Sequence, residues 1–198
     1  MKNSKLDCLS EIRNELSHSS KIFKNVDVKK LINIVNLIKK TISKNGAIFV
    51  CGNGGSASTA NHMVCDFLKR VKYKNKHTRI FSLNSNFELL TAISNDISFD
   101  NIFSFQIDKI CSKDDLLIMF SVSGNSKNLL KAASLANRKK IKTISFTGSN
   151  GGKLKKNSFL NLNINSLNYG IVEDAHLMIM HNISDAIINK KNLIKVNQ

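Results

Sequence analysis

The chain has 198 residues, 42% of them apolar, which suffices for one domain with a sizeable core and argues against extended disorder. No apolar run approaches the roughly 18 residues of a membrane-spanning helix. The N-terminal stretch carries Asp7, Glu11 and Glu15 where a secretion signal would be uninterrupted apolar sequence. The four cysteines are too few and too irregularly spaced for a disulfide framework. We therefore expect a cytoplasmic protein that does not associate with membranes.

The formal net charge of +16 arises from 30 lysines and arginines against 14 acidic residues. Such an excess is found in proteins that bind nucleic acids, membrane surfaces or anionic substrates. Here the basic residues are mostly lysines, scattered along the chain in pairs such as Lys39-Lys40 and Lys139-Lys140 rather than gathered with aromatic residues. We interpret the excess as compositional bias with solvated surfaces, and nucleic-acid binding is not favoured.

The pattern of apolar residues predicts alternating helices and strands. Residues 1–45 are predicted to be helical, because Leu31, Val35 and Ile38 recur at the three- and four-residue spacing of one helix face. Short apolar runs predict strands at 47–51, 79–83, 116–121, 143–146 and 160–164, with helices at 57–71, 86–95 and 126–139 between them. This alternation predicts an α/β fold with a central parallel sheet. No linker interrupts residues 1–198, so one domain suffices.

The last predicted helix covers residues 172–189 and is apolar almost all round. His176, Ile179 and Ile183 share its most regular apolar face, while Met178 and Met180 lie on others. Such a helix is buried, either in the centre of the domain or in a subunit interface. We expect His176 to have a packing or interface role.

Two loops after predicted strands have the composition of phosphate-binding sites. The first, residues 51–58, offers three glycines and two serines at the start of a helix, where backbone amides and the helix dipole attract an anion. Its G-x-G-G-S spacing is neither a dinucleotide fingerprint nor a Walker loop. The second, residues 121–126, offers three serines at the same position after a later strand, although such serines also serve as helix caps.

A third loop, residues 147–152, has a similar composition, and we interpret it as structural. In an open parallel sheet, ligands bind at the carboxyl ends of the strands. The first two loops therefore predict a ligand there, and their composition favours a sugar phosphate over a nucleotide.

The segments G-N-G-G-S-A-S, S-V-S-G-N-S-K-N and T-G-S-N-G-G-K-L resemble, in this order, those of the sugar isomerase (SIS) domain and, within it, of the phosphoheptose isomerases. The resemblance extends over residues 46–189, and residues 90–96 are similar to a family segment whose Asn-Asp pair lies at the substrate. It implies a three-layer SIS fold preceded by N-terminal helices, with residues 1–45 packing on the domain or a subunit interface. It also implies a homotetramer, or a homodimer, with active sites between subunits.

The activity implied by this resemblance is the conversion of sedoheptulose 7-phosphate to D-glycero-D-manno-heptose 7-phosphate, for heptose precursors of lipopolysaccharide or capsule. The residues implied to bind the substrate are Asn53, Gly54, Gly55, Ser56, Asn95, Asp96, Ser121, Val122, Ser123, Ser126 and Glu173.

The resemblance further implies a zinc ion held by His62 and Asp66 on one helix and by Glu173 and His181 on the last. Asp66 stands where the family has a longer glutamate, and Glu173 where it has a glutamine. Glu173 and His181 are about 12 Å apart along a helix axis, which makes a shared metal ion difficult. Asp66 is the first candidate for the catalytic base, with Glu173 as substitute, and His181 would open the ring or move a proton to oxygen.

Three alternatives remain open from the sequence. His62 could be an ordinary surface histidine, and His181 could make a core hydrogen bond instead of binding a ligand. The changes at Asp66 and Glu173 would suit an isomerase of another sugar phosphate in surface-polysaccharide synthesis. A non-catalytic SIS regulator that binds a replication initiator is the third alternative, although it would not need all four of these side chains.

Overall fold

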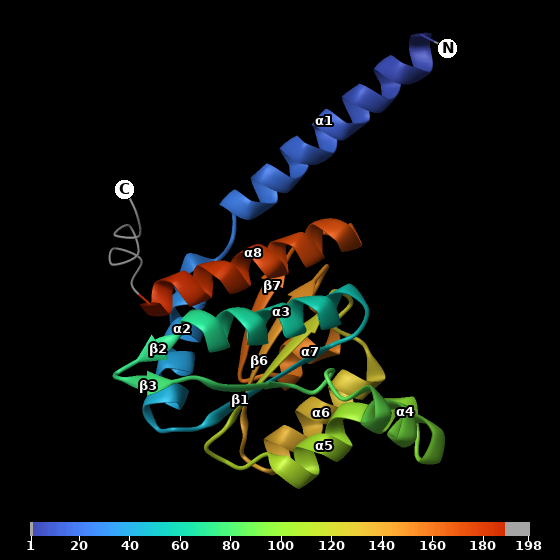
Figure 1. Ribbon diagram of the computed structural model, residues 1–198. Coiled ribbons are helices and arrows are strands. Elements are labelled where there is room, and N and C mark those ends of the chain that lie inside the picture. Colours follow the sequence, from blue (N-terminus) through green and yellow to red (C-terminus); the bar gives the residue numbers. More distant parts are fainter. Residues whose placement is uncertain (1, 189–198) are drawn as a thin grey trace.

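A computed structural model describes residues 2–188, and its centre is a sheet of five parallel strands in the spatial order β4-β1-β5-β6-β7 (Figure 1). The strands are β1 (Ala47–Gly52), β4 (Arg79–Ser82), β5 (Leu116–Ser121), β6 (Lys142–Gly148) and β7 (Leu160–Ile164). The predicted α/β fold is confirmed, with each predicted strand within two residues of its observed bounds. The order of the strands reverses at β1, so the switch point of the sheet lies between β1 and β5.

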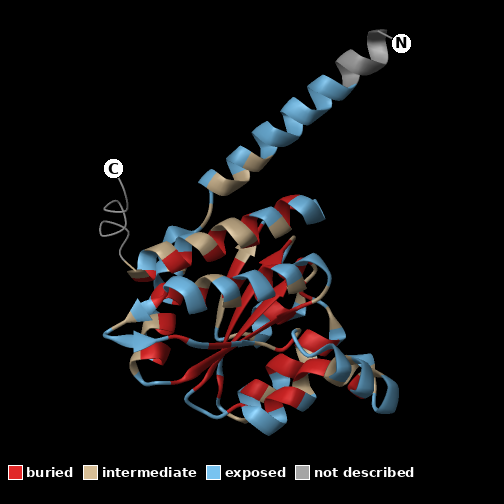
Figure 2. Ribbon diagram, viewed as in Figure 1, coloured by how far each residue is buried: buried red, intermediate tan, exposed pale blue. Residues whose placement is uncertain are grey.

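Helices cover both faces of the sheet and form three layers. One face carries α2 (Val28–Ser43), α3 (Gly55–Arg70) and α8 (Tyr169–Ile188). The other carries α4 (Phe87–Asp96), α5 (Ile102–Ile110), α6 (Lys127–Arg138) and the short α7 (Gly152–Asn157). Successive strand residues alternate between the two cores: Ile48 and Val50 pack with the first set, Phe49 and Cys51 with the second. Both layers bury their sheet-facing residues (Figure 2).

The N-terminal region predicted as helical consists of two helices. Helix α1 (Lys2–Lys24) ends before Asp27, whose carboxylate caps α2 by accepting a hydrogen bond from the Lys30 amide at 3.0 Å. Most of α1 projects away from the sheet and is exposed (Figures 1 and 2). It contacts α8, and the side-chain amide of Asn168 donates a 3.3 Å hydrogen bond to the carboxylate of Glu15.

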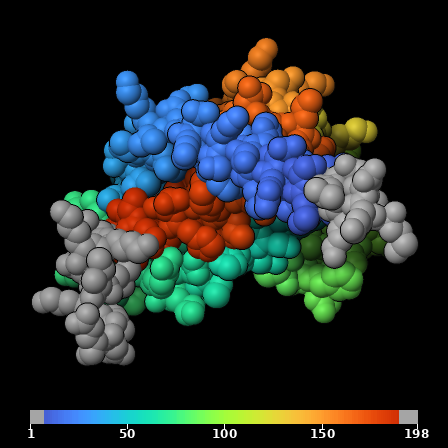
Figure 3. Space-filling view, turned by 90° about the horizontal axis from the view of Figure 1, so that it is seen from above, coloured from blue at the N-terminus to red at the C-terminus, as the bar shows by residue number. Residues whose placement is uncertain are grey.

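Helix α8 lies between α2 and α3 (Figure 3). It begins at Tyr169, three residues before the predicted start, and Asn189, the predicted last residue, lies outside the described residues. Its nearly all-round apolar character is explained by this position, because one face packs on the sheet and the flanks pack on neighbouring helices. Among the described helices, none combines the length and apolar character that crossing a membrane requires.

Five elements were not predicted from the sequence: two short strands, a 3₁₀ helix and the helices α5 and α7. A small hairpin joins β2 (Lys72–Tyr73) to β3 (Lys76–His77), and both turn residues, Lys74 and Asn75, have positive φ. The 3₁₀ helix η1 (Phe99–Asn101) leads into α5, and α7 follows the third loop.

Candidate active site

The first loop joins β1 to the start of α3 and is held in a tight turn. Gly54 has a φ of 54°, a backbone conformation that favours glycine. A Cβ on Gly52 would lie 2.6 Å from the carbonyl carbon of Ser56, so the chain can turn here only without a side chain. Asn84 follows β4. Its side-chain oxygen accepts a 3.1 Å hydrogen bond from the backbone N–H of Gly52, and its side-chain nitrogen donates one of 2.8 Å to the carbonyl of Gly52. The strand that pairs with β1 thus fixes the base of the loop.

Asn53, predicted to bind the sugar, makes a reciprocal amide pair with Asn128 of α6. The two side chains exchange hydrogen bonds of 3.0 and 2.9 Å. Asn128 is buried, and this pair ties the first loop to the helix that follows the second loop. The structure therefore gives Asn53 a role in joining the two loops, and its contact with substrate stays a prediction.

The second loop follows β5 and lies next to the first at the switch point of the sheet. The Ser121 hydroxyl accepts a 3.1 Å hydrogen bond from the Gly124 amide, and the Ser123 hydroxyl accepts one of 3.2 Å from the Asn125 amide. Ser126 precedes the first turn of α6, but its hydroxyl makes no capping hydrogen bond. Ser126 is thus the N-cap residue of α6 by position, but its side chain does not cap the helix. Its predicted contact with phosphate stays a prediction.

The third loop supports the second. The carbonyl of Gly124 accepts a 2.9 Å hydrogen bond from the Leu154 amide, and the carbonyl of Val122 accepts one of 2.9 Å from the Gly148 amide. The Lys153 amide donates to the Asn125 side chain at 3.0 Å. The Gly148 contact agrees with the structural role predicted for residues 147–152, and the other two contacts come from α7, which follows this loop.

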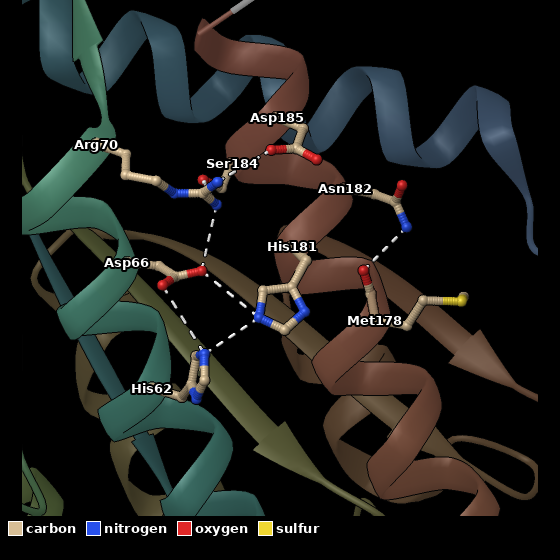
Figure 4. Close-up of polar contacts among 8 residues, drawn as sticks. All are labelled: His62, Asp66, Arg70, Met178, His181, Asn182, Ser184 and Asp185. Atoms are coloured by element: carbon tan, nitrogen blue, oxygen red, sulfur yellow. Dashed lines mark hydrogen bonds and ion pairs between the residues drawn. The ribbon is translucent and has the colours of Figure 1, made fainter. Parts of the chain in front are cut away.

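His62, Asp66 and His181 meet on the outer side of α3 and α8 (Figure 4). The Nε2 atoms of the two histidines are 3.1 Å apart. Asp66 presents Oδ1 at 3.8 Å from His62 Nε2 and Oδ2 at 3.5 Å from His181 Nε2. The two imidazoles and the carboxylate lie within 4.8 Å of one another, and both histidine side chains are more than 40% exposed.

Arg70, one turn after Asp66, was missed by sequence reasoning. Its Nη2 is 3.3 Å from Asp66 Oδ2 and 2.9 Å from the Ser184 hydroxyl, and its Nη1 is 3.4 Å from Asp185 Oδ1 (Figure 4). The four-residue spacing from Asp66 is a signal for an ion pair on one helix. The partners Ser184 and Asp185 lie on α8, where no local pattern points to Arg70.

Glu173, a residue of α8, lies away from this cluster and next to the start of α3. A Cβ built on Gly55 would come within 2.5 Å of the carboxyl carbon of Glu173, so this carboxylate lies directly against Gly55. Helices α3 and α8 are therefore parallel: Glu173 faces Gly55 at one end, and His181 faces Asp66 further along. Glu173 is not part of the group of possible metal ligands found among the described residues.

Asn95 and Asp96 end α4, where the Asn95 amide donates a 2.8 Å hydrogen bond to Asp96. Both are exposed, and the hydrogen bonds and ion pairs of the described chain link neither to the serine loop nor to the histidine cluster. Their predicted contact with substrate stays a prediction.

His176 is fully buried between Phe120 and Phe146, with ring centroids 6.0 and 6.1 Å away. The expected packing role is confirmed. Burial lowers the pKa of His176 to about 4, and the nearby backbone of Thr147 offsets only part of this effect. That backbone falls short of hydrogen-bonding geometry, and neither ring nitrogen has a hydrogen-bond partner among the described residues.

The fold and the paired loops define a SIS-domain protein. A family model described as the SIS domain matches residues 13–148. The solved phosphoheptose isomerase of Neisseria gonorrhoeae is similar with a TM-score of 0.84 and 25% identity, over 92% of this chain and 99% of that one. That of Francisella tularensis has a TM-score of 0.85 and 25% identity, over 94% and 99%.

Sequence comparison narrows this class. The phosphoheptose isomerase of Helicobacter pylori is 39% identical over 153 residues, which are 77% of this chain and 80% of that protein. The phosphoheptose isomerase of Aliarcobacter butzleri is 33% identical over 181 residues, or 90% and 96% of the two chains. The chain belongs to the phosphoheptose isomerase family.

Proposed function

We propose that this protein is an aldose–ketose isomerase that converts sedoheptulose 7-phosphate to D-glycero-D-manno-heptose 7-phosphate. One observation carries the proposal beyond family membership. Helix α3 begins in the first loop and brings His62 to His181 seven residues further on, or about 10 Å along its axis. A sugar whose hydroxyl groups lie at the first loop would thus extend along α3 to an acid and two imidazoles.

The second loop is the better place for the phosphate. The free hydroxyl of Ser126 stands at the start of α6, where the helix dipole attracts an anion. At the start of α3, by contrast, the Glu173 carboxylate already lies against Gly55 and would repel a phosphate. Glu173 and the first loop are therefore suited to the hydroxyl groups of the sugar.

The isomerisation moves a proton between adjacent carbons through an enediol, so it needs a base at carbon and an acid at oxygen. Asp66 supplies the base. Among the described residues, its Oδ2 is paired with Arg70 and His181, whereas Oδ1 is paired with the more distant His62 Nε2 alone and would take the proton. His181 Nε2 would return a proton to oxygen. Glu173, about 12 Å from His181 along α8, is the substitute base if the substrate reacts nearer the first loop.

The cluster also fits a zinc ion. Two histidines and one carboxylate form the three-ligand set found in catalytic zinc sites, which keep a fourth position open. His62, Asp66 and His181 would hold the metal through the atoms that otherwise exchange protons, so with zinc bound Glu173, which would not complete the set, would be the base. When bound, zinc polarises a substrate carbonyl and stabilises negative charge on its oxygen.

The proposal extends to the self-association of this protein and to the use of its product. On α1, Leu9, Ile12 and Leu16 recur on one face and are 52%, 52% and 66% exposed, which supports self-association into the expected homotetramer or homodimer. The product would serve as a heptose precursor of lipopolysaccharide or capsule. The cytoplasmic location expected from the sequence stays a prediction.

The test is turnover of sedoheptulose 7-phosphate by purified protein, with and without added zinc and with its zinc content measured. Asp66→Asn should lower kcat about 100-fold or more, because general base catalysis contributes at least that much. Asp108→Asn removes an exposed carboxylate that pairs with Lys109 on α5 and with Lys139, the C-cap residue of α6, and should leave kcat unchanged. If Glu173→Gln is inactive and Asp66→Asn is not, Glu173 is the base. A folded, zinc-loaded protein without turnover would refute the proposed activity, and turnover of a pentose or hexose phosphate instead would favour the related isomerase.

A further inference from the structure

Lysines that are scattered in the sequence gather around one small cavity in the fold. The cavity has a volume of about 130 Å³ and lies at the amino ends of β1, β5 and β6. Five lysines from three separate segments line it: Lys40, Lys44, Lys113, Lys140 and Lys142. The serine loops follow the carboxyl ends of the same parallel strands, so the cavity lies at the opposite edge of the sheet from the candidate active site.

The charges of these lysines are not balanced within the chain. Two acidic residues, Asp114 and Asp115, also line the cavity, which leaves a net charge of +3 from five lysines and two aspartates. Asp115 is buried and already occupied: its carboxylate accepts hydrogen bonds from the Ala47 amide at 2.8 Å and from the amide and hydroxyl of Ser112 at 2.7 and 2.9 Å. The Asp115 carboxylate is thus hydrogen-bonded to Ala47 and Ser112 rather than paired with the lysines.

None of the five lysines forms an ion pair with a carboxylate of the described residues. Neighbouring lysines behave differently, since Lys131 and Lys139 do pair with aspartates. Among the five, Lys142 has its ammonium 4.3 Å from the centre of the Phe159 ring. Like charges around one hollow repel one another, and an anion bound between them would remove that cost.

Position at helix ends explains only part of this arrangement. Lys40 and Lys44 belong to the last turn of α2 and its cap, where cations favour the helix dipole. The same effect on the two other segments, at residue 113 and at residues 140–142, does not require their lysines to converge on a common cavity.

We propose that this cavity binds a compact multivalent anion of the pyrophosphate class. Pockets for drug-sized ligands measure about 300–1,000 Å³, so a volume of about 130 Å³ suits a small inorganic anion rather than a nucleotide. Lysine ammonium groups bind phosphate oxygens as point charges and need no fixed planar geometry. Because the lysines are exposed, binding weakens as the ionic strength rises.

The proposal is tested by titrating the full-length protein with inorganic pyrophosphate, using calorimetry at low and at high salt. Lys113→Gln/Lys140→Gln should weaken binding at least tenfold and leave isomerase activity unchanged, which also shows that the variant folds. Lys29→Gln/Lys156→Gln removes the same charge from two exposed lysines outside the cavity and should bind as the wild type does.

Three outcomes would overturn the proposal. Equal weakening in both double variants would mean general attraction by the net charge of +16. Competition between pyrophosphate and sedoheptulose 7-phosphate would place the anion at the serine loops. Binding of each variant to duplex DNA is measured as well. If Lys113→Gln/Lys140→Gln loses DNA binding while its pyrophosphate binding is unaffected, the lysines belong to a nucleic-acid surface.

Discussion

Acid should destabilise this protein through His176, and replacing that residue should remove the effect. The ring is fully buried, and its pKa falls from 6.5 to about 4 because burial disfavours the charged form. Between these two pKa values the unfolded chain binds a proton that the folded protein does not. The contribution of neutral His176 to the free energy of unfolding is therefore fully present above pH 6.5 and is lost as the pH falls from there towards about 4.

The gap between the two pKa values corresponds to about 3 kcal/mol. Most of it, about 2 to 3 kcal/mol, should be lost between about pH 7.5 and about pH 4.5. His176→Phe keeps an aromatic ring between Phe120 and Phe146 and removes two nitrogens that have no hydrogen-bond partner. Any packing cost of the larger ring is independent of pH, so it cancels when each protein is compared with itself.

The assay is urea denaturation at both pH values, at one protein concentration because the chain is expected to self-associate. The wild type should lose about 2 to 3 kcal/mol more than His176→Phe on acidification. His77→Gln changes an exposed histidine on β3 and should keep the wild-type loss. If His176→Phe and the wild type lose equal stability, the ring is not buried as a neutral group and the reasoning fails.

Two further predictions concern the active site. Gly124→Ala should lower the free energy of unfolding by at least about 1 kcal/mol and raise KM, because Gly124 has a φ of 61° and a Cβ there would meet the carbonyl of Gly151. Gly170→Ala, in the open first turn of α8, is the control: it should not lower the free energy of unfolding and should leave KM unchanged. Arg70→Gln should cost less than about 1 kcal/mol of stability, since its ion pairs are partly exposed, yet lower kcat by loosening Asp66. Partial recovery of kcat in Arg70→Lys with KM unchanged would support this positioning role, whereas a change in KM alone would contradict it.

The sequence was most informative where the signal is local. Buried strands appear as short apolar runs, and turns that approach a ligand need glycine and serine, so the sheet and its loops were predicted closely. The hairpin at Lys74 and Asn75 was missed because its strands are short, rich in lysine and exposed, and therefore carry no apolar alternation.

Contacts between distant segments were the part that the sequence could not supply. The pairing of Asn53 with Asn128, and of Arg70 with Ser184 and Asp185, depends on which helices become neighbours. The same limit applies to the lysines, which are scattered along the chain but converge at the amino ends of the strands. Charge counted along a sequence therefore says little about where charge gathers in a fold.

The parallel packing of α3 and α8 explains why Glu173 and His181 are separated in the site. Two residues of one helix that are eight positions apart lie about 12 Å from each other along its axis. On a parallel neighbour, each finds a partner at its own level, which is Gly55 for Glu173 and Asp66 for His181. The two helices thus offer Glu173 beside the loops and, further along, the cluster for which we propose the catalytic role. A substrate with its phosphate and its carbonyl at opposite ends of a carbon chain matches that division, because each end meets the groups that its chemistry needs.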